Sequence, residues 1–183
     1  MPSPLSHAIA GLALAPVFFR RDRLREPCLW GALCAVLPDV DLIGFPLGFA
    51  EDPTFGHRAL THSLPMAACF AAVVTLGAFR QARWDGLRLR LWIYLFLATA
   101  THGLLDALSV YGAHVTFFAP FSTLGTKFSW QPIDASMLMG SATWTVRVLR
   151  AILVEARWVW LPAIAIAGIG LTVRRPDPPG AVD

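Results

Sequence analysis

What this sequence has little of is charge. Charged residues make up only 15% of its 183 positions, against the quarter that is usual in soluble domains. Hydrophobic residues make up 56%, and a soluble domain of this length cannot bury that much apolar surface. The composition therefore predicts an integral membrane protein. It argues against a soluble helical bundle, because the helices of such a bundle would carry charged faces.

Other absences narrow the class further. The three cysteines, Cys28, Cys34 and Cys69, form no CxxC pair, so we expect neither a disulfide nor a thiolate metal site. The first apolar run has no basic residue before it, whereas a secretory signal carries its positive charge first. We therefore expect residues 5–19 to remain as a helix of the mature protein. The sequence also shows no internal repeat of the kind that many transporters have.

Apolar runs recur along the chain, and several approach the about 17–25 residues that a membrane-spanning helix needs. They cover residues 5–19, 28–50, 64–79, 89–108 and 158–173. The predicted fold class is therefore all-α, a polytopic membrane bundle of four to five transmembrane helices plus an interfacial outer segment. We expect residues 1–173 to form a single membrane-embedded domain and residues 174–183 to form a disordered cytoplasmic tail.

Basic residues mark the ends of these runs. Most of the fifteen lysines and arginines stand in three clusters, at residues 20–25, 80–90 and 174–175. The positive-inside rule places all three clusters on the cytoplasmic face, so they indicate topology and not nucleic-acid binding. Residues 109–157 then lie on the outer side, and within them residues 136–153 are expected to form an amphipathic helix on the membrane surface.

Ionisable side chains inside the apolar runs are costly in a membrane and indicate function. Counted from the cytoplasmic ends at about 1.5 Å per helical residue, they lie roughly 16–27 Å up, in the outer half of a core about 30 Å thick. These residues are His7, Asp39, Asp41, His62, His102 and Asp106, with His57 just outside. Four helices thus bring costly groups to one level, which favours a shared metal or proton-handling site.

Two local spacings refine this site. THGLLD places His102 and Asp106 at i and i+4 on one helix face, where they can share an ion or the aspartate can orient the histidine. Asp39 and Asp41 follow Pro38 and are two residues apart, so on a regular helix they would point in nearly opposite directions. Either the helix breaks near Pro38, or only one of the two aspartates is a ligand.

The stretch HRALTHSLP contributes a further group of polar residues before an apolar run. His57 and His62 are five positions apart and would diverge on a helix, but a loop there would fold His57 over the site. Thr61 or Ser63 is expected to cap the helix that follows. Arg58 is a candidate to bind an anionic phosphate oxygen, with snorkelling to the interface as the alternative.

The candidate ligands offer imidazole and carboxylate groups but no thiolate. This set suits a divalent transition metal, with zinc first and manganese or iron as alternatives, in a site that keeps an open position. Such an ion supplies a nucleophile near neutral pH. The metal-ligand candidates are His7, Asp39, His62, His102 and Asp106. The catalytic candidates are Asp41 as the general base, together with Arg58 and His57.

Six short motifs follow one another along the chain: SHAIAG, LPDVD, HRALTHS, HGLLDALSVYG, APFS and PID. Their order and wording resemble the YdjM-type family of inner-membrane proteins, described as membrane-bound metal-dependent hydrolases, over roughly residues 4–135. The resemblance implies functional roles at the matching positions, which are His7, Asp39, Asp41, His57, His62, His102, Asp106 and Asp134. A more distant likeness to zinc-dependent phospholipase C implies phosphoester hydrolysis, although its late histidine and glutamate motif has no match here and a full three-metal site is not expected.

The prediction is a membrane-embedded metal-dependent hydrolase in the bacterial inner membrane, with its site facing the outer side. A phosphoester or lipid-linked substrate is expected because the site lies at headgroup depth in the lipid bilayer. Two alternatives remain open: an ion or proton transporter that uses the same His/Asp cluster, and a non-enzymatic membrane protein with a structural metal. The pattern indicates no oligomeric state, and it does not decide whether Asp134 and His114 join the site.

Overall fold

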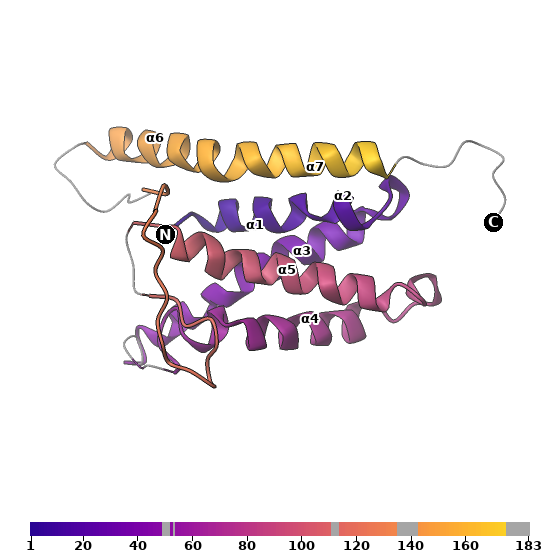
Figure 1. Ribbon diagram of the computed structural model, residues 1–183, viewed down its shortest axis with the longest axis horizontal. Coiled ribbons are helices and arrows are strands. Elements are labelled where there is room, and N and C mark those ends of the chain that lie inside the picture. The colour runs from indigo at the N-terminus through magenta and orange to yellow at the C-terminus, as the bar shows by residue number, and fades with distance from the viewer. Residues whose placement is uncertain (49–51, 53, 111–113, 135–142, 175–183) are drawn as a thin grey trace.

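The computed structural model describes residues 1–48, 52, 54–110, 114–134 and 143–174 (Figure 1). This part of the chain is helical and contains no β-strand, only isolated bridges between Ser109 and Ile133 and between Val115 and Thr126. The predicted all-α class is therefore confirmed. The α-helices are α1 (Pro4–Ala13), α2 (Ala15–Phe18), α3 (Arg25–Val36), α4 (Leu64–Ala78), α5 (Arg88–Ala107), α6 (Trp144–Glu155) and α7 (Leu161–Val173). Short 3-10 helices are η1 (Arg21–Arg23), η2 (Leu37–Gly44), η3 (Leu60–His62) and η4 (Ala82–Trp84), and η5 (Ala156–Trp160) is a π-helical turn.

Two helices in the described ranges are long and apolar enough to cross a membrane. One covers Arg25–Gly44, where η2 continues α3, and the other covers Trp144–Val173, where α6, η5 and α7 continue one another. Shorter apolar helices cover Pro4–Phe18 and Leu64–Ala78. The helical class of the predicted bundle is thus confirmed, while the number of four to five membrane passes stays a prediction.

The last helix differs from the prediction. We expected a surface helix over residues 136–153 and a separate membrane helix from Trp158, but α6 and α7 lie end to end as one long helix from Trp144 (Figure 1). The turn between them is π-helical and directly precedes α7. Pro162, in the first turn of α7, cannot donate an α-helical hydrogen bond, and a local π-helical turn accommodates such a gap without ending the helix.

The outer interfacial segment predicted over residues 109–157 contains both loops and helix. Within it, residues 109–110 and 114–134 run as loops and isolated bridges, and α6 begins at Trp144. The outer location of this segment stays a prediction. The start of the predicted surface helix, residues 136–142, and most of the predicted disordered tail, residues 175–183, lie outside the described residues.

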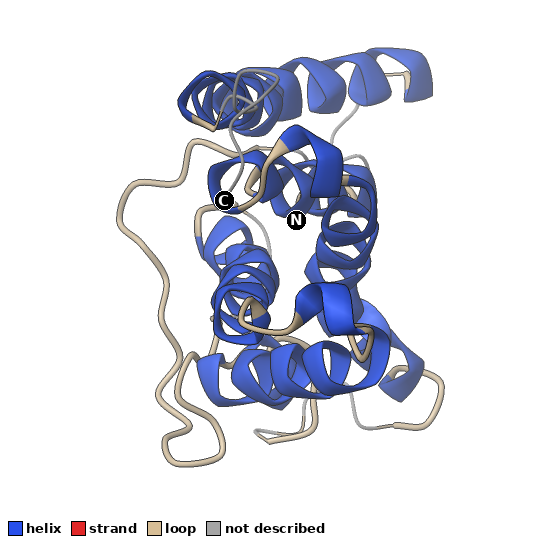
Figure 2. Cartoon of the chain, turned by 90° about the vertical axis from the view of Figure 1, so that its right-hand side faces the viewer, coloured by secondary structure: helices blue, strands red, loops and turns tan. Residues whose placement is uncertain are grey.

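The helices pack in two groups. Helix α1 packs against α3, and both α3 and α4 pack against α5, while α7 lies along α2 (Figures 1 and 2). Small residues allow close crossings, as they do between membrane helices in general. A Cβ added at Gly11 would lie 2.5 Å from the Gly31 carbonyl oxygen on α3, and one at Gly170 would lie 2.6 Å from the backbone of Pro16.

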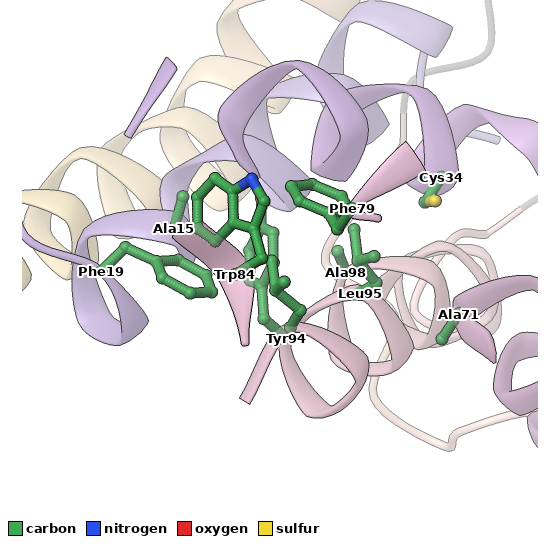
Figure 3. Packing of buried hydrophobic residues seen from close by; sticks show 10 residues of the cluster. Ala15, Phe19, Cys34, Ala71, Phe79, Trp84, Tyr94, Leu95 and Ala98 are labelled. Carbon is green, nitrogen blue, oxygen red and sulfur yellow. The ribbon is translucent and has the colours of Figure 1, made fainter. Parts of the chain in front are cut away.

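An apolar cluster fills the part of the bundle around the first half of α5 (Figure 3). Phe19, Phe79 and Trp84 pack around Tyr94, and all four side chains are nearly fully buried. The Tyr94 hydroxyl lies 2.9 Å from the Pro27 carbonyl oxygen and 3.2 Å from that of Gly11. The Tyr94 hydroxyl is therefore paired with helix carbonyls of α3 and α1.

The bundle has a basic end and a loop end. The turns between α2 and α3 and between α4 and α5, and the end of α7, lie together at the right of Figure 1. They are also bonded to one another: Arg23 donates to the Arg83 carbonyl at 3.2 Å, and Arg174 Nε donates to the Val17 carbonyl at 2.6 Å. The described residues of the three basic clusters thus lie at one end, and the long loops lie at the other.

Candidate metal centre

The predicted ligands come together at the loop end of the bundle. His7 comes from α1, Asp39 from η2, His62 from η3, and both His102 and Asp106 from the last turns of α5. His7 and His102 are fully buried, Asp106 is 1% exposed and His62 is 4% exposed. Four separate elements therefore deliver their ionisable side chains to one buried place, as the depth estimate predicted.

The i, i+4 spacing on α5 places His102 and Asp106 on the buried face of that helix. Gly103 stands between them and lets η3 approach, because a Cβ at this position would lie only 2.9 Å from the His62 carbonyl oxygen. A side chain larger than hydrogen at residue 103 would push His62 away from α5. The motif HGLLD thus serves both the ligand pair and the close approach of a third ligand.

The helix changes type near Pro38, which decides how Asp39 and Asp41 point. Helix α3 ends at Val36 and continues as the 3-10 helix η2. Three residues complete a 3-10 turn, so residues i and i+2 diverge by about 120° instead of about 160°. Asp39 therefore faces His102, whereas Asp41 faces His57 and His62, and both aspartates reach the site.

The loop before η3 carries His57 to the rim of the site. Its turn is stabilised by Asp52, whose Oδ1 accepts from the backbone N–H groups of Phe55 at 2.7 Å and Thr54 at 2.8 Å. These two hydrogen bonds lower the pKa of Asp52. His57 Nδ1 lies 2.8 Å from Asp41 Oδ1, so the loop does fold over as expected.

Arg58 points inward from an unusual backbone conformation. Its φ of 68° lies in the left-handed region, which non-glycine residues seldom adopt. Its N–H donates to Asp41 Oδ2 at 3.1 Å and its carbonyl accepts from the Thr116 N–H at 3.1 Å. The side chain is 2% exposed, with Nε 2.9 Å from Asp106 Oδ2. The snorkelling alternative for Arg58 is therefore wrong.

The proton positions on His102 can be deduced from its partners. Nδ1 lies 2.7 Å from the Ala35 carbonyl oxygen, and because a carbonyl only accepts, Nδ1 must carry the proton. In neutral His102 this leaves the lone pair of Nε2 facing Asp39 Oδ1 at 3.3 Å. Two acceptors so close repel one another unless a cation or an extra proton lies between them.

The other two histidines also direct Nε2 toward a carboxylate. His62 Nδ1 lies 3.1 Å from Asp41 Oδ2, and its Nε2 lies 3.6 Å from Asp106 Oδ2. His7 Nε2 lies 3.6 Å from Asp106 Oδ1, and the His7 ring stacks on that of His102 at 3.7 Å between centroids. Within the described ranges, all three Nε2 atoms and both Asp39 carboxylate oxygens are buried without a hydrogen bond.

These separations fit a bound divalent cation. Zinc binds histidine nitrogen at about 2.0–2.1 Å in tetrahedral geometry, which places neighbouring ligand atoms about 3.3 Å apart. Two sets of three residues offer ligand atoms within 4.8 Å of one another: His7, His102 and Asp106, and Asp39, His57 and His62. An extra proton on every histidine is a poor alternative, because their stacked and edge-on rings would then hold like charges in contact.

Further residues that the sequence analysis singled out have other positions. Asp134 forms an ion pair with Arg150 at 2.9 Å, and His114 is exposed on a loop. Neither belongs to the two ligand sets that the described residues form. Ser63 is the N-cap of α4 and accepts from the Met66 N–H at 3.2 Å, as predicted for one of the two capping candidates.

Two further residues hold the ligand candidates, and only Thr61 was a candidate from the sequence, either as a helix cap or as a support for the ligands. Thr61 donates its hydroxyl proton to Asp41 Oδ2 at 2.7 Å, and the Ala35 backbone holds His102. Thr61 is visible in HRALTHS, but its partner depends on how η2 folds beside η3. Ala35 acts through its carbonyl oxygen, for which no side-chain pattern exists.

Comparisons with known proteins identify the family of this chain. The family described as YdjM inner membrane protein matches residues 1–176. The chain belongs to this family. It is also similar to the inner membrane protein YbcI of Escherichia coli (strain K12), with 33% identity over 172 residues that cover 92% of this chain and 96% of that protein. No solved structure matches the chain significantly. The family resemblance is thus confirmed, and both names state a location in the inner membrane.

Proposed function

We propose that this chain is a metal-dependent hydrolase embedded in the inner membrane. The observation that carries the proposal is the set of buried acceptor atoms that face one another without hydrogen bonds. A buried polar atom without a partner costs about 1–3 kcal/mol, and here several such atoms lie within 3.3–3.9 Å of one another. Divalent cations held by the two ligand sets would give these acceptors a partner.

In this proposal the metal ligands are His7, Asp39, His62, His102 and Asp106. Histidine and aspartate ligands fit zinc first, and manganese or iron second. The set exceeds the four ligands of a closed structural zinc site, which favours catalysis. A divalent ion bound there supplies Lewis acidity and a nucleophile near neutral pH.

The surrounding residues orient the ligands and move the proton. The Asp41 carboxylate already accepts from His57, Thr61 and the Arg58 N–H, so we assign it an orienting role in place of the predicted general base. His57 is half-buried at the rim and is held at Nδ1 by Asp41, which makes His57 the better candidate for proton transfer. Arg58 places a positive charge beside Asp106, where a phosphate oxygen would bind.

The geometry also supports a substrate at the outer face. The basic turns lie at the end of the bundle opposite the site (Figure 1), and the positive-inside rule assigns the basic end to the cytoplasm. A site at the outer end, near headgroup depth, suits a phosphoester or a lipid-linked substrate. Reporter fusions at residues 85 and 125 test this: residue 85 should report cytoplasm and residue 125 the outer side. A cytoplasmic signal at residue 125 would overturn the assigned side.

The metal is tested by measuring metal per chain in protein purified without chelators. We expect near-stoichiometric transition metal in the wild type, and its loss in His102→Ala. The matched control is His114→Ala, because His114 is exposed and outside the site, and it should keep the metal. Wild-type protein that carries no metal would disprove the proposed site.

The reaction is tested with the metal-loaded protein on an aryl phosphate and on vesicles that contain phosphatidic acid. Phosphate release should require the metal and should fall at least a hundredfold in His57→Ala. Metal-loaded protein without turnover, combined with ion flux into liposomes that Asp39→Asn and Asp106→Asn abolish, would instead favour the transporter. If the metal-loaded protein shows neither hydrolysis nor ion flux, the metal would have a structural role.

A further inference from the structure

Another buried carboxylate lies next to the candidate metal centre and has no role in the scheme above. Glu155, the last residue of α6, is 3% exposed. Its carboxylate accepts three hydrogen bonds from the start of α1: from Ser3 N–H at 2.9 Å and from the hydroxyls of Ser3 and Ser6 at 2.5 Å each. A buried carboxylate in a helix of membrane-spanning length is costly and therefore indicates a function.

The partners of Glu155 control the first turn of α1. Ser3 is the N-cap of this helix and accepts from the Ser6 N–H at 3.3 Å. The Ser6 hydroxyl donates to Glu155 and accepts from Trp160 Nε1 at 2.7 Å. Each hydroxyl thus acts as both donor and acceptor, so the network is closed and fixes the position of the turn on α6 and η5.

The next residue after Ser6 is His7, and its ring is held differently from those of the other ligands. Ala35 holds Nδ1 of His102 and Asp41 holds Nδ1 of His62. In the described structure neither ring nitrogen of His7 has a hydrogen-bond partner. The direction of the His7 ring is therefore set by its stacking on His102 and by the position of the α1 backbone.

We propose that Glu155 is the positioning residue for His7. It holds the first turn of α1 so that His7 Nε2 faces Asp106, the task that a direct hydrogen bond performs for the other two histidines. Residues that orient metal ligands typically change metal affinity 10–100-fold when they are lost. The inference rests on the proposed metal site, and Glu155 itself touches neither substrate nor ion.

A rival reading is that Glu155 only docks α6 and α7 onto α1, as polar residues do between membrane helices. The chain offers a control for this reading at the other end of the same long helix. Gly170 crosses α2 so closely that an added Cβ would lie 2.6 Å from the Pro16 and Val17 backbone. Gly170→Ala therefore disturbs the docking of α7 far from the metal ligands.

The test measures zinc affinity of the purified full-length chain, and the visible absorption of bound Co²⁺ as a signature of the ligand set. Glu155→Ala should weaken zinc binding 10–100-fold and should give the same Co²⁺ spectrum as His7→Ala. In the His7→Ala background, Glu155→Ala should cause no further loss. Gly170→Ala should keep the wild-type spectrum and an affinity within threefold of the wild type.

Other outcomes would overturn the inference. An equal loss for Glu155→Ala with and without His7, or a similar loss in Gly170→Ala, would show docking alone. Unchanged affinity in Glu155→Ala would refute the positioning role and leave the metal site intact, whereas a wild type without metal affinity would refute both. If Glu155→Ala does not fold, Ser6→Ala decides, because it removes only the hydroxyl next to His7 and should weaken zinc binding about tenfold.

Discussion

The two halves of α5 pass through two very different interiors. Around Tyr94 the helix lies in an apolar cluster, and the Tyr94 hydroxyl is close to two carbonyl oxygens. One and a half turns before its end the same helix presents His102 and then Asp106. There His102 Nε2 faces Asp39 Oδ1 at 3.3 Å and Asp106 Oδ1 faces His7 Nε2 at 3.6 Å. The Tyr94 hydroxyl has hydrogen-bond partners, whereas the loop end retains buried atoms without hydrogen bonds among the described residues, and the proposed metal ion would give these atoms a partner.

The contrast shows that a buried polar group indicates a binding site only when it lacks hydrogen-bond partners, and not by its burial alone. Tyr94 is as buried as His102, yet only His102 retains a buried nitrogen without a hydrogen bond among the described residues. We therefore expect substitutions at the loop end to change metal binding and those at the basic end to change stability alone. Four predictions test this difference, in order of decreasing effect.

The largest effect is expected for Asp106→Asn. The substitution removes a ligand charge and the partner that lies 2.9 Å from buried Arg58. Breaking a buried ion pair costs about 3–5 kcal/mol, and bound metal should be lost as well. Unfolding in detergent together with metal analysis measures both effects. Asp134→Asn is the control, because its pair with exposed Arg150 should be worth at most about 1 kcal/mol; equal effects would contradict the comparison.

Asp41→Asn should weaken metal binding without removing a ligand. The amide cannot accept all the hydrogen bonds that the carboxylate receives from His57, Thr61 and the Arg58 N–H. Loss of such an orienting partner typically lowers metal affinity 10–100-fold, which zinc titration measures. Tyr94→Phe, a polar deletion in the other interior, should leave the affinity unchanged. A similar loss in both variants would mean that the two interiors are not independent.

Gly31→Ala should affect only the apolar interior. A Cβ at Gly31 would lie 1.7 Å from the Tyr94 hydroxyl oxygen and 2.5 Å from its ring, so Tyr94 must move. Overpacking of this kind costs about 1–3 kcal/mol, measured as a fall in unfolding free energy at unchanged zinc affinity. Gly77→Ala is the matched control, since nothing lies within 4 Å of its added Cβ. A loss of zinc affinity in Gly31→Ala would show coupling between the two ends.

The smallest effect is expected for Asp52→Ala in the loop that carries His57. Hydrogen bonds from the Phe55 and Thr54 N–H groups lower the pKa of Asp52 in the folded protein. Their contribution to stability is therefore present above the ordinary aspartate pKa and is lost as pH falls through the lower folded value. Unfolding of wild type and variant should differ slightly at neutral pH and converge in acid. A difference that persists in acid would contradict this cause.

Much of the site followed from local patterns. The i, i+4 pair in HGLLD and the common depth of the costly side chains predicted which residues meet, because helix geometry relates sequence spacing directly to position. Placing Asp39 and Asp41 required the structure, since the α to 3-10 change at Pro38 decides the direction of both. Arg58 likewise turned inward through a backbone conformation that its sequence does not signal.

The boundary of the last helix shows a different kind of error. Residues 136–153 were predicted to form a surface helix because Arg147 and Arg150 would face water or lipid headgroups on an amphipathic helix. In the structure both arginines belong to a helix that runs without a break from Trp144 to Val173. The local charge pattern favoured a break before Trp158, but the helical backbone continues through the π-helical turn η5. Charge in the sequence therefore did not predict this helix boundary.

By itself, the sequence determined the helical class and the membrane character, and it selected the histidines and aspartates that are candidate ligands, because these depend on composition and on spacing along single helices. The tertiary structure alone decided which atoms face one another: the Ala35 carbonyl behind His102, Asp41 between His57 and His62, and Glu155 on the first turn of α1. Such contacts join residues as far as 152 positions apart. They depend on how helices cross, which no spacing along one helix encodes.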